Sequence, residues 1–337
     1  MYFLVKLFFK LPGKVLLWLS GKDQLKTKGG RRLDPGFQLL LRLMGNTSAD
    51  FSLSAPVIRE GLAKQSKVFS SVLAKGVTFL DHEITSNGQI IRVREYIPQG
   101  LPSNAPALVY FHGGGWALLD IESHHVLTGF LSKELNAKVF SVDYRLAPEH
   151  PYPEGLCDCE EVFNWVKSNA KNLELNPERI SVGGDSAGGN LAASLCLKIK
   201  QESSDLPKAQ LLLYPATELT FSHASIDELS EGFLLTKESM NWFREQYLPN
   251  ENLVKEPLVS PLVAEDLSGL PPAVLVTAGF DPLRDEGDEY AEALLKADVE
   301  THHLTFDGYI HGFANMELIS GVDKTLKIIC NDFKKIF

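Results

Sequence analysis

The sequence predicts an α/β fold with a mostly parallel central sheet, helices on both of its faces and a helical cap. Three observations carry this prediction. From residue 107 onward, short apolar runs alternate with helical stretches, as in buried parallel strands connected by helices. Residues 1–75 instead repeat their apolar positions every three or four residues, which is the period of helices. The length of 337 residues suits one large α/β domain with an accessory part.

The first twenty residues combine large apolar side chains with lysines at positions 6, 10 and 14. A membrane span needs about twenty consecutive apolar residues, and every uncharged run in this segment is much shorter. A signal peptide has its charges before the apolar core, whereas here the lysines lie within it. Two interpretations stay open: a helix packed on the body of the protein, and a helix lying on a membrane surface. We favour packing, because Pro12 and Gly13 divide the helix into two short halves.

The next elements are indicated by local start and turn signals. Asp34 and Pro35 form a helix start, with the aspartate as the cap and the proline in the first turn. Near residue 77 the apolar period changes to two, and Asn87-Gly88 separates two alternating segments. Since Asn-Gly is the strongest short hairpin signal, we expect residues 77–96 to form an antiparallel hairpin.

One segment interrupts the later alternation of strands and helices. Residues 223–256 hold no good strand and one convincing helix, 236–247, which starts with Thr236 and Ser239 in an imperfect capping box. We expect this segment to lie over the sheet together with the N-terminal helices. The predicted strands are 107–111, 137–142, 179–183, 209–214, 273–278 and 300–306, and helices include 158–170 and 189–201. The predicted segments are an N-terminal helical cap segment (1–75), a first core part (76–216), a cap insertion (217–256) and a second core part (257–337).

Composition narrows the class of partner. The net charge of −10 and the pI near 5.4 disfavour binding to the phosphate backbone of nucleic acids. The four cysteines, at 157, 159, 196 and 330, fit neither a zinc site nor a secreted disulfide framework. We therefore expect reduced thiols in a cytoplasmic protein.

The first motif that carries chemistry is Gly-Asp-Ser-Ala-Gly at residues 184–188. It directly follows a predicted strand and directly precedes a predicted helix. Gly-x-Ser-x-Gly in this context is a nucleophile elbow, in which glycines on either side leave room for a strained serine. The helix that begins after the serine also directs its positive dipole end toward developing negative charge. Ser186 is therefore the predicted nucleophile.

The second motif is His-Gly-Gly-Gly-Trp at residues 112–116, just after a predicted strand. An oxyanion hole needs backbone N–H groups that converge on one point without side chains in the way, and consecutive glycines provide this. We expect the N–H groups of Gly113 and Gly114 to donate, together with that of Ala187, the residue after the nucleophile.

A serine nucleophile needs a base, and the base needs an acid that orients it. Along the chain the order is nucleophile, acid, base. Asp281 follows the strand 273–278 at the place expected for the acid, and His311 lies in the loop after the last predicted strand. Three other acidic residues are set aside as structural or solvated, because they fall in the next predicted helix: Asp285, Glu286 and Asp288. Other histidines are set aside as the base. His302 and His303 fall within a predicted strand, and His124 and His125 precede the serine.

Together these motifs resemble the hormone-sensitive-lipase-like group of α/β-hydrolases, specifically its bacterial esterases with a Gly-Asp-Ser-Ala-Gly motif. The resemblance covers residues 76–337. It implies the α/β-hydrolase fold, a cap over the acyl pocket, the triad Ser186, Asp281 and His311, and a scaffold role for residues 144–148. It implies no metal and no organic cofactor. The matching segments are HGGGW at 112–116, DYRLAPEHPYP at 143–153, GDSAGGNLA at 184–192, DPLRDEG at 281–287 and HGF at 311–313.

The predicted activity is hydrolysis of short- to medium-chain carboxylic esters, with a small-molecule ester as the substrate. An amidase or deacetylase on the same triad stays open, because the acyl-enzyme chemistry is shared. A membrane-associated lipase is a further alternative, based on peripheral contact through residues 1–20, and a homodimer is also open. A non-catalytic ligand-binding homologue is disfavoured, because serine, acid and base are all present.

Overall fold

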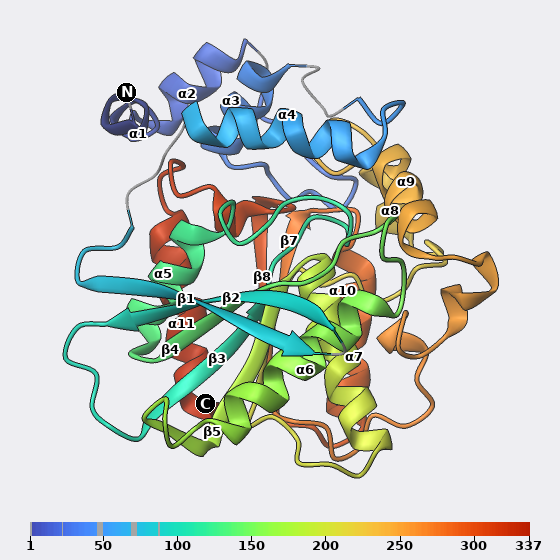
Figure 1. The fold of residues 1–337 in the computed structure, drawn as a ribbon. Coiled ribbons are helices and arrows are strands. Elements are labelled where there is room, and N and C mark those ends of the chain that lie inside the picture. Colours follow the sequence, from blue (N-terminus) through green and yellow to red (C-terminus); the bar gives the residue numbers. More distant parts are fainter. Residues whose placement is uncertain (1, 22, 46–49, 69–72, 87) are drawn as a thin grey trace.

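The computed structural model describes the chain except residues 1, 22, 46–49, 69–72 and 87. Its centre is an eight-stranded sheet with the strand order β1-β2-β4-β3-β5-β6-β7-β8 (Figure 1). The strands are β1 (Val77–Ser86), β2 (Gln89–Pro98), β3 (Ala105–Phe111), β4 (Lys138–Asp143), β5 (Leu175–Asp185), β6 (Gln210–Leu213), β7 (Ala273–Phe280) and β8 (Thr301–Ile310).

The sheet is parallel except at one side. β1 and β2 form the expected antiparallel hairpin, with Val77 opposite Pro98, and β2 is also antiparallel to β4. All other neighbours pair in parallel. The carboxyl ends of β3, β5, β7 and β8 therefore meet at one edge, and the loops that leave this edge carry the predicted site residues.

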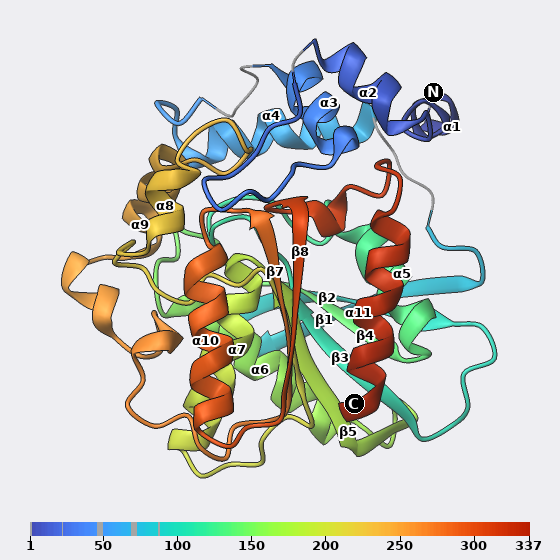
Figure 2. The same cartoon turned by 180° about the vertical axis from the view of Figure 1, so that it is seen from behind.

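Helices cover both faces of the sheet, as the alternation of buried runs predicts (Figures 1 and 2). α5 and α11 lie together on one face, and α6, α7 and α10 lie on the other. The helices are α1 (Tyr2–Phe8), α2 (Gly13–Ser20), α3 (Pro35–Met44), α4 (Ala55–Val68), α5 (His125–Leu135), α6 (Glu154–Ser168), α7 (Ala187–Gln201), α8 (Ala224–Glu228), α9 (Lys237–Tyr247), α10 (Arg284–Lys296) and α11 (Val322–Ile336), with short 3-10 turns at Glu251–Lys255, Pro261–Val263 and Phe313–Asn315.

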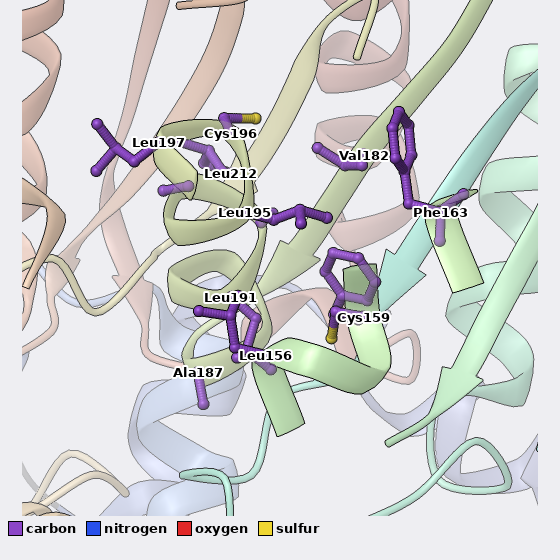
Figure 3. Close-up of a cluster of buried hydrophobic side chains, with 14 of the residues drawn as sticks. Leu156, Cys159, Phe163, Val182, Ala187, Leu191, Leu195, Cys196, Leu197 and Leu212 are labelled. Carbon is purple, nitrogen blue, oxygen red and sulfur yellow. The ribbon is translucent and has the colours of Figure 1, made fainter. Parts of the chain in front are cut away.

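The core beneath the site is built around α7. Figure 3 shows Leu191 and Leu195 of this helix in one buried cluster with Phe163 of α6 and Val182 of β5. All four side chains are at most 1% exposed. Full burial of aliphatic and aromatic side chains stabilises by roughly 1.5–3 kcal/mol each, so α7 is held firmly against the sheet. Its first residue is therefore fixed at the edge where β5 ends.

The local start signals are confirmed. Asp34 accepts a hydrogen bond from the Gly36 N–H at 2.7 Å, with Pro35 as the first residue of α3. Thr236 and Ser239 form a complete capping box at the start of α9. The chain breaks at Pro12 into α1 and α2, as the sequence indicates.

The helices outside the core form a separate layer. α1 to α4 lie above the sheet, with α8 and α9 beside them (Figure 1). Phe51, just before α4, contacts Trp242 and Phe243 of α9 with ring centroids 5.2 and 5.7 Å apart. This layer is called the cap below; the exact division of the chain at residues 75, 216 and 256 stays a prediction. Within the described part of the chain, no helix has the length and apolar character needed to cross a membrane.

Candidate active site

The turn between β5 and α7 places Ser186 in a strained conformation, with φ 55° and ψ −120°. Neighbouring glycines make this turn sterically accessible. A Cβ on Gly184 would come within 2.4 Å of the Gly188 backbone, and one on Gly188 would come within 1.9 Å of the Phe111 carbonyl oxygen. The structure therefore explains both glycines by close backbone approach.

The structure brings the three predicted residues Ser186, His311 and Asp281 together. His311 Nε2 lies 2.8 Å from Ser186 Oγ, and His311 Nδ1 lies 2.7 Å from Asp281 Oδ2. A carboxylate can only accept, so Nδ1–H donates to Asp281 and Nε2 is left to accept from the serine hydroxyl. Asp281 is fully buried, and its second oxygen accepts from the Leu283 N–H at 2.9 Å.

The loop after β8 holds His311 in place. Gly312 has φ 75°, a left-handed conformation that lets the chain turn directly after the histidine. The Tyr214 ring packs edge-on against the imidazole, with centroids 5.0 Å apart, and its hydroxyl accepts from the Ala314 N–H at 3.3 Å. These contacts fix the imidazole plane relative to Ser186.

The competing acids on α10 have structural partners instead. Asp288 accepts from the Thr277 hydroxyl at 2.8 Å, and Asp285 accepts from the Ser225 N–H at 2.8 Å. Glu286 is fully buried and accepts from the Thr217 N–H at 2.7 Å, and burial raises its pKa well above the usual value. None of the three contacts His311.

The backbone N–H of Gly113 has a side-chain partner in the structure. Its N–H does not face the cavity but donates to Asp185 Oδ1 at 3.0 Å. A Cβ at this position would lie only 2.6 Å from Asp185 Oδ2, so the loop and the carboxylate are in close contact. The next two glycines, Gly114 and Gly115, line the cavity beside Ala187. The N–H groups of Gly114, Gly115 and Ala187 donate to no acceptor among the residues that the structure describes.

A buried pair behind this loop was not foreseen. Asp185 accepts from the Tyr110 hydroxyl at 2.8 Å, and His124 Nε2 lies 3.1 Å from Asp185 Oδ1. Burial lowers the pKa of His124, but the Asp185 carboxylate outweighs this effect, so the pKa is raised overall. Burial raises the pKa of Asp185, but His124, with hydrogen bonds from the Tyr110 hydroxyl and the Gly113 N–H, more than offsets this, so the pKa is lowered overall. The position of Asp185 within the serine motif is a sequence signal for a role near the site. No sequence signal points to its partner His124, which lies 61 positions away.

Stability should depend on pH through the His124–Asp185 pair. Because the folded pKa of His124 lies above its unfolded value and that of Asp185 lies below its own, the pair contributes fully between about pH 4 and pH 6.5. Its contribution falls as pH rises through the raised pKa of His124, and it falls again at acid pH as Asp185 takes up a proton. We expect His124→Gln to lower the melting temperature most between about pH 4 and pH 6.5 and progressively less above that range. Thermal unfolding of wild type and variant across a pH series measures this. Exposed His150→Gln is the control, and a pH-independent loss in His124→Gln would contradict the expectation.

The pair Ser186 and His311 lies in the wall of a cavity of about 430 Å³. This volume is typical of small-molecule sites. The cap supplies much of the wall, so the substrate space is not formed by the core alone. No group of three or more metal-ligating side chains occurs among the described residues. The apolar wall residues include Phe51, Leu62, Phe221, Leu234, Met240 and Phe243.

Comparison with known proteins identifies the family. A profile described as the alpha/beta hydrolase fold matches residues 108–315. The carboxylic ester hydrolase LipN of Mycobacterium tuberculosis is 38% identical over 328 residues, which cover 91% of this chain and 86% of that protein. The chain belongs to the hormone-sensitive-lipase-like esterases of the α/β-hydrolase fold.

Other relatives of this esterase agree. The ethyl acetate hydrolase of Pseudomonas putida is 33% identical over 251 residues, or 73% of this chain and 78% of that protein. The solved structure of ester hydrolase EH1AB1 from the metagenome of Lake Arreo superposes with a TM-score of 0.85 at 35% identity, covering 90% of this chain and 98% of that one. The expected fold and the expected class of ester hydrolase are thus confirmed.

Proposed function

We propose that this esterase hydrolyses short- to medium-chain carboxylic esters through an acyl-enzyme intermediate on Ser186. The observation that carries the proposal is the continuous hydrogen-bonded series from Ser186 Oγ through His311 to Asp281, with distances of 2.8 and 2.7 Å. Such a series opening onto an apolar cavity suits attack on the carbonyl of a bound ester.

In the proposed reaction, Ser186 Oγ attacks the ester carbonyl carbon while His311 Nε2 takes the hydroxyl proton. Asp281 holds the imidazole in the correct orientation and stabilises its charged form. Collapse of the tetrahedral intermediate breaks the bond to the alkoxy oxygen, which leaves with the proton from His311. Water then attacks the acyl-enzyme, with His311 again accepting a proton and returning it to Ser186.

The oxyanion of the intermediate is assigned to the N–H groups of Gly114, Gly115 and Ala187. All three residues line the cavity beside Ser186. Gly114 and Gly115 have φ 119° and 59°, and a Cβ on Gly115 would meet the Phe243 ring at 2.1 Å, so this loop tolerates no side chain. Ala187 begins α7, whose first N–H groups have no partner within the helix and add the helix dipole to the site.

The acyl chain length is assigned from the cavity wall. Phe243 projects from α9 onto the glycine loop, where its ring contacts the aromatic cluster around Phe51. We expect Phe243→Ala to lengthen the cavity and to move the preferred p-nitrophenyl ester toward longer acyl chains, with kcat/KM for long esters rising relative to acetate. Kinetics on the ester series measure this shift. Exposed Phe79→Ala, on β1, is the control, and an unchanged chain-length profile in Phe243→Ala would count against this wall.

The proposal is tested by hydrolysis of p-nitrophenyl esters from acetate to palmitate and of the matching anilides. Turnover of the shorter esters with much slower turnover of anilides supports it. The name of the ethyl acetate hydrolase relative is consistent with short substrates. Faster turnover of anilides than of esters would transfer the assignment to an amidase, and inactivity on both would overturn it. The cytoplasmic location and the homodimer stay predictions.

A further inference from the structure

α2 carries apolar side chains that the protein leaves exposed. Val15, Trp18 and Leu19 are open to solvent, with 78% of Trp18 exposed. Spacings of three and four residues place these three on one face of the helix. The face that packs on the protein is a different one, formed by Leu16 and Ser20. An amphipathic helix normally turns its apolar stripe inward, whereas here an apolar stripe remains outside.

The exposed apolar face continues into α1. Leu7 is 64% exposed, and Phe8 and Leu11 are exposed as well, whereas Phe9 between them is buried. Figures 1 and 2 show α1 and α2 at the outer end of the cap, beside the N-terminus. Clustered exposed apolar residues mark an interaction surface, whereas scattered ones do not. The N-terminal apolar surface is defined by Leu7, Phe8, Leu11, Val15, Trp18 and Leu19.

The charge around this surface is opposite to that of the whole protein. Residues 1–32 contain eight lysines and arginines but one acidic residue, Asp23, in a chain of net charge −10. Lys10 and Lys14 are exposed among the apolar positions. Apolar side chains that include a tryptophan, flanked by lysines, are typical of helices that lie in the interface of a membrane containing anionic lipids.

We propose that α1 and α2 bind the surface of an anionic phospholipid bilayer. The N-terminal apolar surface enters the boundary between headgroups and acyl chains, and Lys10 and Lys14 lie against the lipid phosphates. The contact is peripheral, since none of the described helices can span a bilayer. α2 packs against α3, whose last residue, Met44, lines the substrate cavity. Binding therefore brings one wall of the cavity close to esters dissolved in the membrane.

The test is flotation of the purified full-length protein with unilamellar vesicles. One set is phosphatidylcholine alone, and a second contains phosphatidylglycerol as well. Wild type should float with the anionic vesicles, less with the neutral ones, and less as sodium chloride screens the lysines. The variant Val15→Ser/Trp18→Ser/Leu19→Ser should bind anionic vesicles at least about tenfold more weakly, because losing one large buried apolar side chain is enough for that factor.

A matched control carries the same change on other faces: Ile90→Ser/Leu295→Ser/Ile328→Ser replaces three apolar residues that are at least 51% exposed. It should float like wild type. Hydrolysis of dissolved p-nitrophenyl acetate checks that every variant is folded. This activity depends on the site around Ser186 and not on vesicles, so a failure of membrane binding can be told apart from a failure of the proposed esterase function. The proposal is overturned if wild type does not float, or if the α2 variant floats as well as wild type. If wild type does not float and is a dimer, and the α2 variant is a monomer, the surface instead binds a second copy of the chain.

Discussion

Replacing Ser186 with alanine should lower kcat for p-nitrophenyl butyrate by a factor on the order of 10⁴–10⁶ while leaving the fold intact. The serine hydroxyl is the atom that forms the proposed covalent intermediate, and His311 Nε2 at 2.8 Å has no other nucleophile beside it within the described site. Removing one oxygen atom creates no steric conflict in the turn, so thermal unfolding should change little.

Two comparisons make this result specific. Ser268→Ala removes an exposed hydroxyl far along the chain and should retain wild-type kinetics. An organophosphonate ester should add a covalent mass to wild type and none to Ser186→Ala, because the phosphonyl group bonds to the nucleophile. If Ser186→Ala keeps more than a tenth of wild-type kcat, or is still labelled, another residue is the nucleophile.

Replacing Asp281 with asparagine should lower kcat by about 10⁴, equivalent to about 5 kcal/mol of barrier. The carboxylate at 2.7 Å fixes the proton on His311 Nδ1 and stabilises the imidazolium that forms when Ser186 loses its proton. An asparagine amide can present its NH₂ group to Nδ1 and so favour the tautomer in which Nε2 carries the proton and cannot accept one. The variant keeps the volume and the acceptor for the Leu283 N–H.

Asp288→Asn provides the matched comparison. Asp288 follows the same strand and faces Thr277 and His303, not His311. Its replacement should change kcat less than about tenfold. Equal losses in Asp281→Asn and Asp288→Asn, or a larger loss in the second, would remove the acid role from Asp281. Steady-state kinetics on one soluble ester are sufficient for both variants.

Much of the fold was predictable because each element carries a local signal. The hairpin signal at Asn87-Gly88, the cap at Asp34 and the break at Pro12 act through neighbouring residues only. The antiparallel pairing of β1 with β2, the cap and the break all occur as expected, whereas Asn87 itself lies outside the described residues. That Ser186, Asp281 and His311 lie close together was also predictable, because the loops that follow parallel strands meet at the carboxyl edge of the sheet.

The remaining features depend on contacts that no local pattern contains. Gly113 and Gly114 are adjacent glycines that the sequence cannot distinguish. Only the folded structure shows that Asp185 accepts a hydrogen bond from the Gly113 N–H. The sequence places His124 only as a histidine that precedes the serine, and its partner Asp185 is seen only in the fold. The cavity wall joins Phe51 and Phe243, whose side chains meet only after the cap has packed.

The attachment of the N-terminal segment has a consequence for synthesis on the ribosome. Arg31 bonds to Asp307 across 276 positions, and the Asp34 N–H donates to the Gly308 carbonyl. At about 5–20 residues per second, roughly 15–55 s separate the emergence of these partners. During that interval α1 and α2 are exposed on the nascent chain, because the residues against which the N-terminal segment packs have not yet been made. Newly made molecules should therefore need a chaperone, or a nearby membrane, to keep this segment from aggregating before translation ends.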